Sequence, residues 1–271
     1  MTFEQWLFGQ IDNPWIPKQW GFLHIFTMLV SIGLIIGFYF IVKKVENKDK
    51  ARKIIIYTLA ALILFFEVAS RIVYSIKKYH LNTPDMNGLD MLWIILPKPW
   101  CAISCWVLIA SVIVDKKFFY NYASLSALLC SFIFFCYPGV GFNNQYILWD
   151  NLYSIVTHAL LLTMSISLIT LKFTEFKYKD FWKVAICFVL TFGYGLLEIF
   201  VIKTGGVPIQ SDPMYFMPGG DIQAGILGID WGIYITLYIA LILIYINSFY
   251  LIQDKESVKN FFSKFSKKEQ L

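Results

Sequence analysis

Long apolar stretches alternate with short polar segments along almost the whole chain. Each stretch holds about 20 mostly apolar residues, which is the length that an α-helix needs to cross the hydrocarbon core of a bilayer. The pattern predicts an all-α, polytopic integral membrane protein, because only helices and closed barrels satisfy their backbone groups in lipid. Seven transmembrane helices are expected, over residues 20–42, 54–76, 91–114, 118–138, 149–171, 181–202 and 229–252.

The composition agrees with a membrane protein and excludes several other classes. Hydrophobic residues make up 58% of the 271 residues and charged residues only 15%, whereas soluble chains have about 45–50% and about 25%. Aromatic residues reach 18%, which is typical of proteins with aromatic belts at the membrane interfaces. We therefore exclude a disordered chain, a coiled coil and a nucleic-acid partner.

The distribution of lysine and arginine predicts the orientation of the chain in the membrane. Of the 23 basic residues, 17 lie in or beside one alternate set of loops and only four in the other set. By the positive-inside rule the N-terminus is outside and the C-terminus is cytoplasmic. We expect residues 1–253 to form a single transmembrane domain and residues 254–271 a basic amphipathic tail on the inner leaflet. The long loop 203–228 is a candidate lid or re-entrant segment.

Polar side chains inside the predicted spans are the first candidates for function, because they are costly in lipid. All of them are expected between the middle of the bilayer and its outer boundary, while the cytoplasmic half is nearly bare. This clustering in depth predicts one polar cavity that opens to the outer leaflet or the outer surface. The residues are His24, Glu67, Arg71, Lys98, Cys101, Ser104, Cys105, Thr157, His158 and Glu198.

Most of these polar residues have two interpretations. Glu67 and Arg71 are four residues apart on one helix, so they either neutralise each other or brace a site. Lys98 either extends outward to the interface or faces the cavity. Glu198 either pairs with a basic residue or acts as an acid near the site. His24 is either an interfacial histidine or part of the cavity lining.

Cys101 and His158 are expected at a similar depth and carry the most chemistry. An imidazole that takes the proton of a thiol makes a thiolate, and such a pair performs acyl transfer through a thioester. The imidazole then needs an orienting partner, and the oxyanion needs donors. Thr157, Ser104 and Glu198 are all possible orienting groups. Packing is the alternative role for Cys101, because buried cysteines commonly fill space.

The histidines and the other cysteines form no pattern that indicates a metal site. His24 and His158 lie on different predicted spans and have no ligand-spacing motif. Cys130, Cys136 and Cys187 are interpreted as small apolar packing residues. Because all five cysteines lie in apolar segments, a secreted disulfide framework is excluded.

A family resemblance begins at the segment LPKPWC, residues 96–101, and continues to residue 129. This segment resembles the first signature of the YwaF-like bacterial membrane proteins, which are similar to the eukaryotic transmembrane protein 164 family. That pattern runs Leu-Pro-Leu-His-x-Cys, a helix, a short basic turn and a second helix. A proline turn follows, here Pro138-Gly139, and then a span with a Ser-His or Thr-His pair, here Thr157-His158. Glu67 also fits, and the resemblance covers roughly residues 20–250.

The resemblance implies a multi-span fold and, for the eukaryotic branch, a lipid acyltransferase that moves fatty acyl chains between phospholipids. Cys101 and His158 match the cysteine and histidine of that branch. The family histidine two residues before the cysteine is replaced here by Pro99, beside Lys98. The bacterial branch, which this sequence resembles more, implies a plasma-membrane location but no known activity.

We therefore expect a lipid acyltransferase or acyl hydrolase that works at the outer leaflet and needs no cofactor. Cys101 is the expected nucleophile, and His158 is the expected base and later acid. Membrane lipids are the expected partners. A transporter or permease using the same cavity is the first alternative, and a non-enzymatic seven-span component or receptor is the second. The expected substrate-binding residues are Lys98, Glu198, Arg71, Glu67 and His24.

Overall fold

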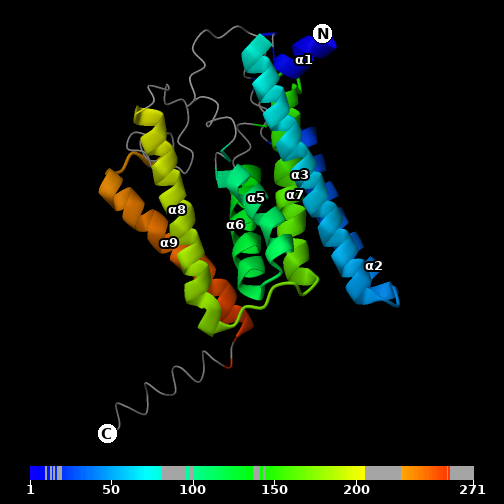
Figure 1. The fold of residues 1–271 in the computed structure, drawn as a ribbon, viewed down its shortest axis with the longest axis vertical. Helices are drawn as coiled ribbons and strands as arrows, with labels where there is room; N and C mark the ends of the chain where they lie inside the picture. Colours follow the sequence, from blue (N-terminus) through cyan, green and yellow to red (C-terminus); the bar gives the residue numbers. More distant parts are fainter. Residues whose placement is uncertain are drawn as a thin grey trace. The chain divides into compact units, whose positions relative to one another are not determined.

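The computed structural model describes most of the chain as a series of helices (Figure 1). It describes residues 1–9, 11–12, 14, 16, 20–80, 96–97, 100–136, 141–142, 144–204, 227–254 and 256, without the side chains of 78–80 and 198–204. Every element in these ranges is helical, so the all-α prediction is confirmed. The elements are α1 (Phe3–Phe8), α2 (Phe22–Lys44), α3 (Lys48–His80), α5 (Trp100–Val114), α6 (Lys117–Cys136), α7 (Trp149–Thr170), the 3-10 helix η1 (Tyr178–Asp180), α8 (Phe181–Thr204) and α9 (Trp231–Gln253).

Six of the described helices are long and apolar enough to cross a membrane, namely α2, α3, α6, α7, α8 and α9. The protein is therefore a multi-pass membrane protein. The third predicted span, 91–114, corresponds to α5, whose described helix has 15 residues and falls short of the usual length of a span. The sequence Pro97-Lys98-Pro99 directly precedes it, and proline disfavours helical backbone in the residue before it. Residues 91–95, 98 and 99 lie outside the described ranges.

The chain divides into two compact units. Unit 1 comprises Met1–Asp115 and Ala123–Phe173, and unit 2 comprises Lys116–Tyr122 and Thr174–Leu271. In unit 1, α7 contacts α2, α3 and α5, and α3 also contacts α5. The short helix α1 packs on α3 and α7 and was not predicted from the sequence. The single transmembrane domain over 1–253 stays a prediction.

Helix α2 turns its polar side inward and its apolar side outward. His24, Thr27 and Ser31 are buried, whereas Leu29 and Ile36 are exposed. The hydroxyls of Thr27 and Ser31 donate to backbone carbonyls one turn earlier, at 2.8 and 2.9 Å. This inverted pattern suits a helix that faces hydrocarbon, where polar groups find partners only inside the protein.

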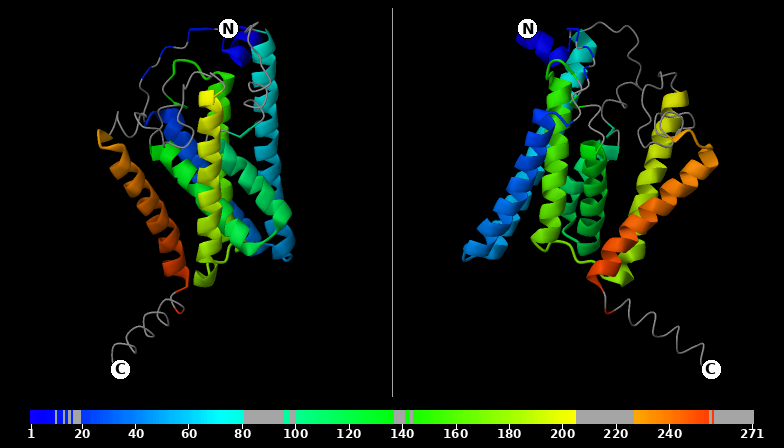
Figure 2. Two further views of the ribbon diagram at one scale, coloured as in Figure 1. Left: turned by 60° about the vertical axis from the view of Figure 1, so that its left-hand side comes forward. Right: turned by 180° about the vertical axis from the view of Figure 1, so that it is seen from behind.

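In unit 2, α9 runs antiparallel to α8 and contacts it (Figure 2). Also within unit 2, Asn121 of α6 binds the segment before η1. Its Nδ2 donates to the Glu175 carbonyl at 2.8 Å and to the Tyr250 hydroxyl at 3.2 Å, and its Oδ1 accepts from the Glu175 N–H at 2.9 Å. The backbone N–H of Tyr178 donates to Asp254 at 2.8 Å. The predicted tail 254–271 and loop 203–228 lie almost entirely outside the described residues.

Candidate active site

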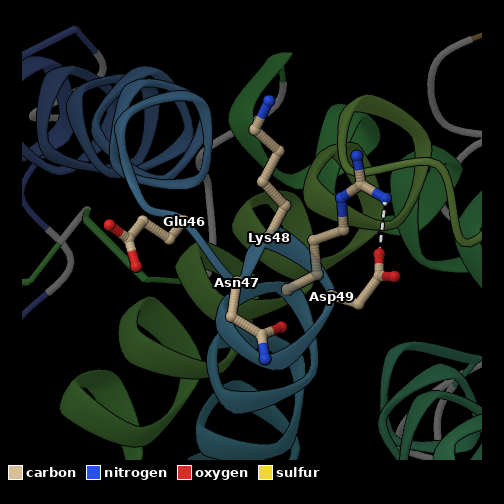
Figure 3. A pocket seen from close by; sticks show the side chains of 5 residues that line it. Glu46, Asn47, Lys48 and Asp49 are labelled. Atoms are coloured by element: carbon tan, nitrogen blue, oxygen red, sulfur yellow. Dashed lines mark hydrogen bonds and ion pairs between the residues drawn. The ribbon is translucent and has the colours of Figure 1, made fainter.

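The turn between α2 and α3 forms an open polar depression (Figure 3). Its lining comes from one continuous segment and carries two acidic and two basic side chains, with Arg52 Nη1 3.0 Å from Asp49 Oδ1. These side chains include no thiol or imidazole, so the depression has no nucleophile–base pair. The lining residues are Glu46, Asn47, Lys48, Asp49 and Arg52.

Cys101 lies in the first turn of α5, directly after Trp100. The N–H groups of a first helical turn have no acceptor within the helix, and the positive end of the helix dipole lies there. The Cys101 sulfur interacts with its own backbone N–H. Its side chain is only partly buried, so it combines a polar setting with access.

The structure brings three side chains together around the Cys101 sulfur. The thiol interacts with the imidazole of His158 on α7 and with the thiol of Cys130 on α6. The similar depth of Cys101 and His158 in the membrane and their catalytic role stay predictions. Cys130 was interpreted from the sequence as an apolar packing residue. Its burial at 4% exposure agrees with that interpretation, while the neighbouring thiol could not be predicted because nothing local to α6 shows which residue it faces.

The backbone of α7 orients His158. Its Nδ1 lies 2.6 Å from the carbonyl oxygen of Ser154. A carbonyl oxygen only accepts hydrogen bonds, so Nδ1 carries the hydrogen, and Nε2 is left as the acceptor in a neutral ring. The ring of Phe134 stacks on the imidazole, with centroids 3.7 Å apart and planes inclined by 10°. Together these contacts fix both the tautomer and the plane of the ring.

Of the three predicted orienting side chains, the two that the structure describes, Thr157 and Ser104, bond elsewhere. Thr157 donates to the carbonyls of Tyr153 and Ser154, at 2.7 and 3.2 Å. The Ser104 hydroxyl lies near Cys130, at 3.4 Å. The side chain of Glu198 lies outside the described residues, as do Lys98 and Pro99. Sequence reasoning missed Ser154 because its role comes from a backbone carbonyl, which every residue has.

A row of polar side chains links α5 and α6 behind Cys101. The indole N–H of Trp100 donates to Ser126 Oγ at 2.9 Å. Ser126 Oγ lies 2.8 Å from Ser104 Oγ, which in turn is 3.4 Å from Cys130 Sγ. Ser104 and Ser126 are fully buried, and the Cys130 thiol interacts with that of Cys101. Polar side chains that bond between helices stabilise helix contacts in membranes.

Glu67 is the centre of a second polar cluster in unit 1. Its side chain is fully buried and accepts from Arg71 Nη1 at 2.8 Å and from the Tyr153 hydroxyl at 2.5 Å. The Cys105 thiol also interacts with this carboxylate, and the Arg71 guanidinium lies over the Trp106 ring at 5.4 Å. The ion pair within α3 therefore forms, and it also ties α3 to α5 and α7.

Tyr153 connects this cluster to the turn that holds His158. Its hydroxyl binds Glu67, while its backbone carbonyl accepts from Thr157. The next residue, Ser154, accepts from His158. The interpretation of Glu67 and Arg71 as a bracing pair is thus consistent with their position, since Glu67 contacts α7 at Tyr153, five residues before His158.

His24 lies in an aromatic environment and not at an exposed interface. Its side chain is fully buried, and neither ring nitrogen makes a hydrogen bond of normal geometry, although it approaches the backbone of Phe135. The rings of Trp20 and Phe142 lie 4.9 and 4.8 Å away. Phe135 and Phe142 share a core cluster with Phe134, which stacks on His158. A substrate-binding role for His24 stays a prediction.

The sequence profile of the TMEM164 family matches residues 17–250. The chain belongs to the TMEM164 family. The match covers Cys101, His158 and Glu67, and with them the helices of the candidate site. No curated protein and no solved structure matches the chain. The resemblance to the transmembrane protein 164 family is thus confirmed, while the YwaF-like assignment and the bacterial plasma membrane stay predictions. In the described part of this TMEM164 family member, no group of three or more His, Cys, Asp or Glu side chains could hold a metal ion.

Proposed function

We propose that this TMEM164 family protein is a membrane-embedded lipid acyltransferase or acyl hydrolase that works through a thioester on Cys101. One observation carries the proposal. The Cys101 thiol, in the first turn of α5, interacts with an imidazole whose other nitrogen is occupied by the Ser154 carbonyl. A nucleophile, a base and a group that orients the base are the parts that acyl transfer requires.

The first half-reaction forms the thioester. His158 Nε2 takes the proton of the Cys101 thiol, and the sulfur attacks the ester carbonyl of a membrane lipid. The tetrahedral intermediate carries an oxyanion, which backbone N–H groups in the first turn of α5 are suited to stabilise. The intermediate collapses as the ester C–O bond breaks, and the imidazolium returns its proton to the leaving alkoxide. A lysolipid leaves, and the acyl group stays on sulfur.

The second half-reaction releases the acyl group. The hydroxyl of a lysolipid, or water in a hydrolase, gives its proton to His158 Nε2 and attacks the thioester carbonyl. The C–S bond then breaks, and the Cys101 sulfur regains a proton from the imidazolium. The same residue therefore acts as base and acid in turn. The transferase and the hydrolase differ only in the acceptor.

The substrate reaches such a site from the bilayer itself. We place the reaction at the outer leaflet, because the charge distribution puts the start of α5 toward the outside. Lys98, Glu198 and Arg71 are our candidates for binding a head-group phosphate. Arg71 keeps 20% of its side chain exposed while it pairs with Glu67.

A lipid turnover experiment tests the proposal. The purified protein in nanodiscs receives a phospholipid with an isotope-labelled acyl chain and an unlabelled lysolipid, and mass spectrometry follows the label. We expect transfer or release by the wild type and none by Cys101→Ala or His158→Ala. Cys187→Ala is the matched control and should keep full activity, because Cys187 lies in unit 2.

A covalent readout separates this mechanism from the alternatives. Without lysolipid, a transferase should accumulate label on Cys101 that neutral hydroxylamine removes. No transfer across several head groups, with variants as stable as the wild type, would overturn the proposal. Transport that survives Cys101→Ala would favour a permease instead. A stable stoichiometric protein partner, without lipid turnover, would favour a non-enzymatic component.

A further inference from the structure

Cys130 contributes a second thiol that the proposed reaction does not use. Its side chain is 4% exposed, so it is sealed from solvent and from lipid. It interacts with the Cys101 sulfur and lies 3.4 Å from the Ser104 hydroxyl. A buried thiol held between a hydroxyl and a partly exposed thiol is not simply filling space.

In this row one hydrogen bond has a fixed direction, and the other two can run either way. The Trp100 indole N–H only donates, so Ser126 Oγ accepts from it at 2.9 Å. Ser126 Oγ lies 2.8 Å from Ser104 Oγ, and Ser104 Oγ lies 3.4 Å from Cys130 Sγ; in each pair either atom can be the donor. The Cys130 thiol also interacts with that of Cys101. Because a thiolate carries no hydrogen, the Cys130 S–H is the donor between the two sulfurs once Cys101 is charged.

We propose that Cys130 is a positioning residue that donates its S–H hydrogen bond to the Cys101 thiolate. The inference rests on the proposed function, because it assigns a role within the same site. When Cys130 donates to Cys101, its sulfur is open to the Ser104 hydroxyl at 3.4 Å, and such a chain of hydrogen bonds polarises the last donor and strengthens its bond to a negative sulfur. The thiolate then has two partners with different roles. His158 exchanges its proton, and Cys130 stabilises its negative charge.

The row also explains why Cys101 and not Cys130 is the nucleophile. Cys101 is partly exposed, lies at the beginning of a helix and faces an imidazole. Cys130 lies in the fourth turn of α6, is buried and has the Ser104 hydroxyl 3.4 Å away. Its sulfur therefore serves as a relay between a hydroxyl and a thiolate.

The test measures the reactivity of Cys101 directly. The full chain in nanodiscs is alkylated with iodoacetamide across a range of pH, and the modified Cys101 peptide is quantified by mass spectrometry. Removal of a hydrogen bond to a charged group changes an equilibrium by about tenfold or more. We therefore expect Cys130→Ala to move the midpoint of the pH profile upward by about one unit.

Two further variants keep the test informative. Cys130→Ser retains a donor of similar size, so its profile should stay near that of the wild type. Ser104→Ala interrupts the row one step earlier and should give a smaller upward shift than Cys130→Ala. Cys187→Ala, in the other unit, is the matched control and should change nothing. If Cys130→Ala does not fold, the other two variants still test the inference. Ser104→Ala should then move the midpoint of the Cys101 profile upward, and Cys130→Ser should not.

The outcomes separate this inference from the proposed function. Unchanged Cys101 profiles in folded Cys130→Ala and Ser104→Ala would overturn the role of Cys130, whether or not the protein transfers acyl groups. A shifted profile without lipid turnover would sustain the hydrogen bond and remove the acyltransferase proposal. A shift that Cys187→Ala reproduces would also overturn the inference, because the effect would then be general.

Discussion

The Nδ1 atom of His158 lies 2.6 Å from the carbonyl oxygen of Ser154, one turn earlier on α7. A backbone carbonyl therefore takes the place that a carboxylate side chain holds in many catalytic triads. This partner is neutral, so the imidazole is oriented without a second buried charge. The relationship explains why no acidic residue needs to lie beside His158.

Because a carbonyl orients the imidazole, the neighbouring hydroxyl should be dispensable. Thr157→Val removes a donor to the carbonyls of Tyr153 and Ser154 but keeps the shape of the side chain. We expect lipid turnover within about threefold of the wild type, because each hydrogen bond contributes little net free energy. His158→Ala, measured in parallel, should be inactive. A Thr157→Val variant that is folded and equally inactive would contradict this assignment.

The stacked ring of Phe134 should control the position of His158. Phe134→Leu removes the flat surface that lies 3.7 Å from the imidazole. We expect a loss of turnover of about tenfold or more, because a small displacement of a catalytic group is costly. Phe132→Leu on the same helix is the control, since Phe132 is 60% exposed, and it should stay near wild type. Equal turnover in the two variants would argue against a role for the stack.

The buried ion pair of Glu67 and Arg71 should be important for stability. Glu67→Gln leaves the Arg71 charge without its partner, and breaking a buried pair costs about 3–5 kcal/mol. We expect a clearly lower thermal unfolding temperature in detergent. Replacing both residues by leucine should recover most of the loss, because it removes both charges.

An exposed ion pair provides the control for that measurement. Asp49 and Arg52 form a pair at 3.0 Å, in which the Asp49 side chain is 85% exposed. Exposed pairs contribute about 0–1 kcal/mol, so Asp49→Asn should change the unfolding temperature little. A similar effect of Glu67→Gln and Asp49→Asn would show that the Glu67 cluster is not buried as described.

The contact between Cys101 and Cys130 predicts a disulfide under mild oxidation. Diamide should take two electrons and two protons from the two thiols and be reduced to the hydrazine. We expect a loss of two mass units in the linked peptides, loss of lipid turnover and recovery with dithiothreitol. Cys187 should remain a free thiol that can still be alkylated after the oxidation. Cross-linking of Cys101 to any other cysteine, instead of Cys130, would contradict the contact.

Removing the charge of the Glu175 side chain should destabilise the protein less than removing Asn121, which bonds the Glu175 backbone. Asn121 bonds both backbone groups of Glu175 and the Tyr250 hydroxyl, so Asn121→Ala should cost about 2–3 kcal/mol at about 1 kcal/mol per bond. Glu175→Gln loses only an ion pair that is half exposed, at 2.5 Å from Lys177. Thermal unfolding of the two variants checks this difference.

The same ion pair gives a pH dependence with a defined sign. The hydrogen bond from Lys177 lowers the pKa of Glu175, and the carboxylate raises the pKa of Lys177. The Glu175 contribution is present above its unfolded pKa and is lost as pH falls through its lower folded pKa. The Lys177 contribution is present below its unfolded pKa and is lost as pH rises through its higher folded pKa. Between about pH 5 and pH 10 the unfolding temperatures of the wild type and Glu175→Gln should therefore differ by a constant amount.

The length of α5 shows where local sequence reasoning stops. The predicted span 91–114 rests on hydropathy. The described helix begins only at Trp100, after Pro97 and Pro99, whose effect on the backbone is not measured by hydropathy. The other spans agree with helices α2, α3, α6, α7, α8 and α9 to within a few residues at most of their ends. Helix α1 was not predicted from the sequence, because its six residues are too few to show the apolar pattern of a transmembrane helix.

The sequence by itself determined that this protein is an all-helical, multi-pass membrane protein, since span length and apolar content are local properties set by the thickness of a bilayer. It also singled out Cys101, His158 and Glu67, because polar groups are rare in lipid. The tertiary structure alone decided that Cys130 faces Cys101, that Tyr153 binds Glu67 and that Ser154 orients His158. These relationships depend on how each helix is rotated about its axis and on which neighbour it meets. That rotation comes from side-chain packing between distant segments, which no local pattern encodes.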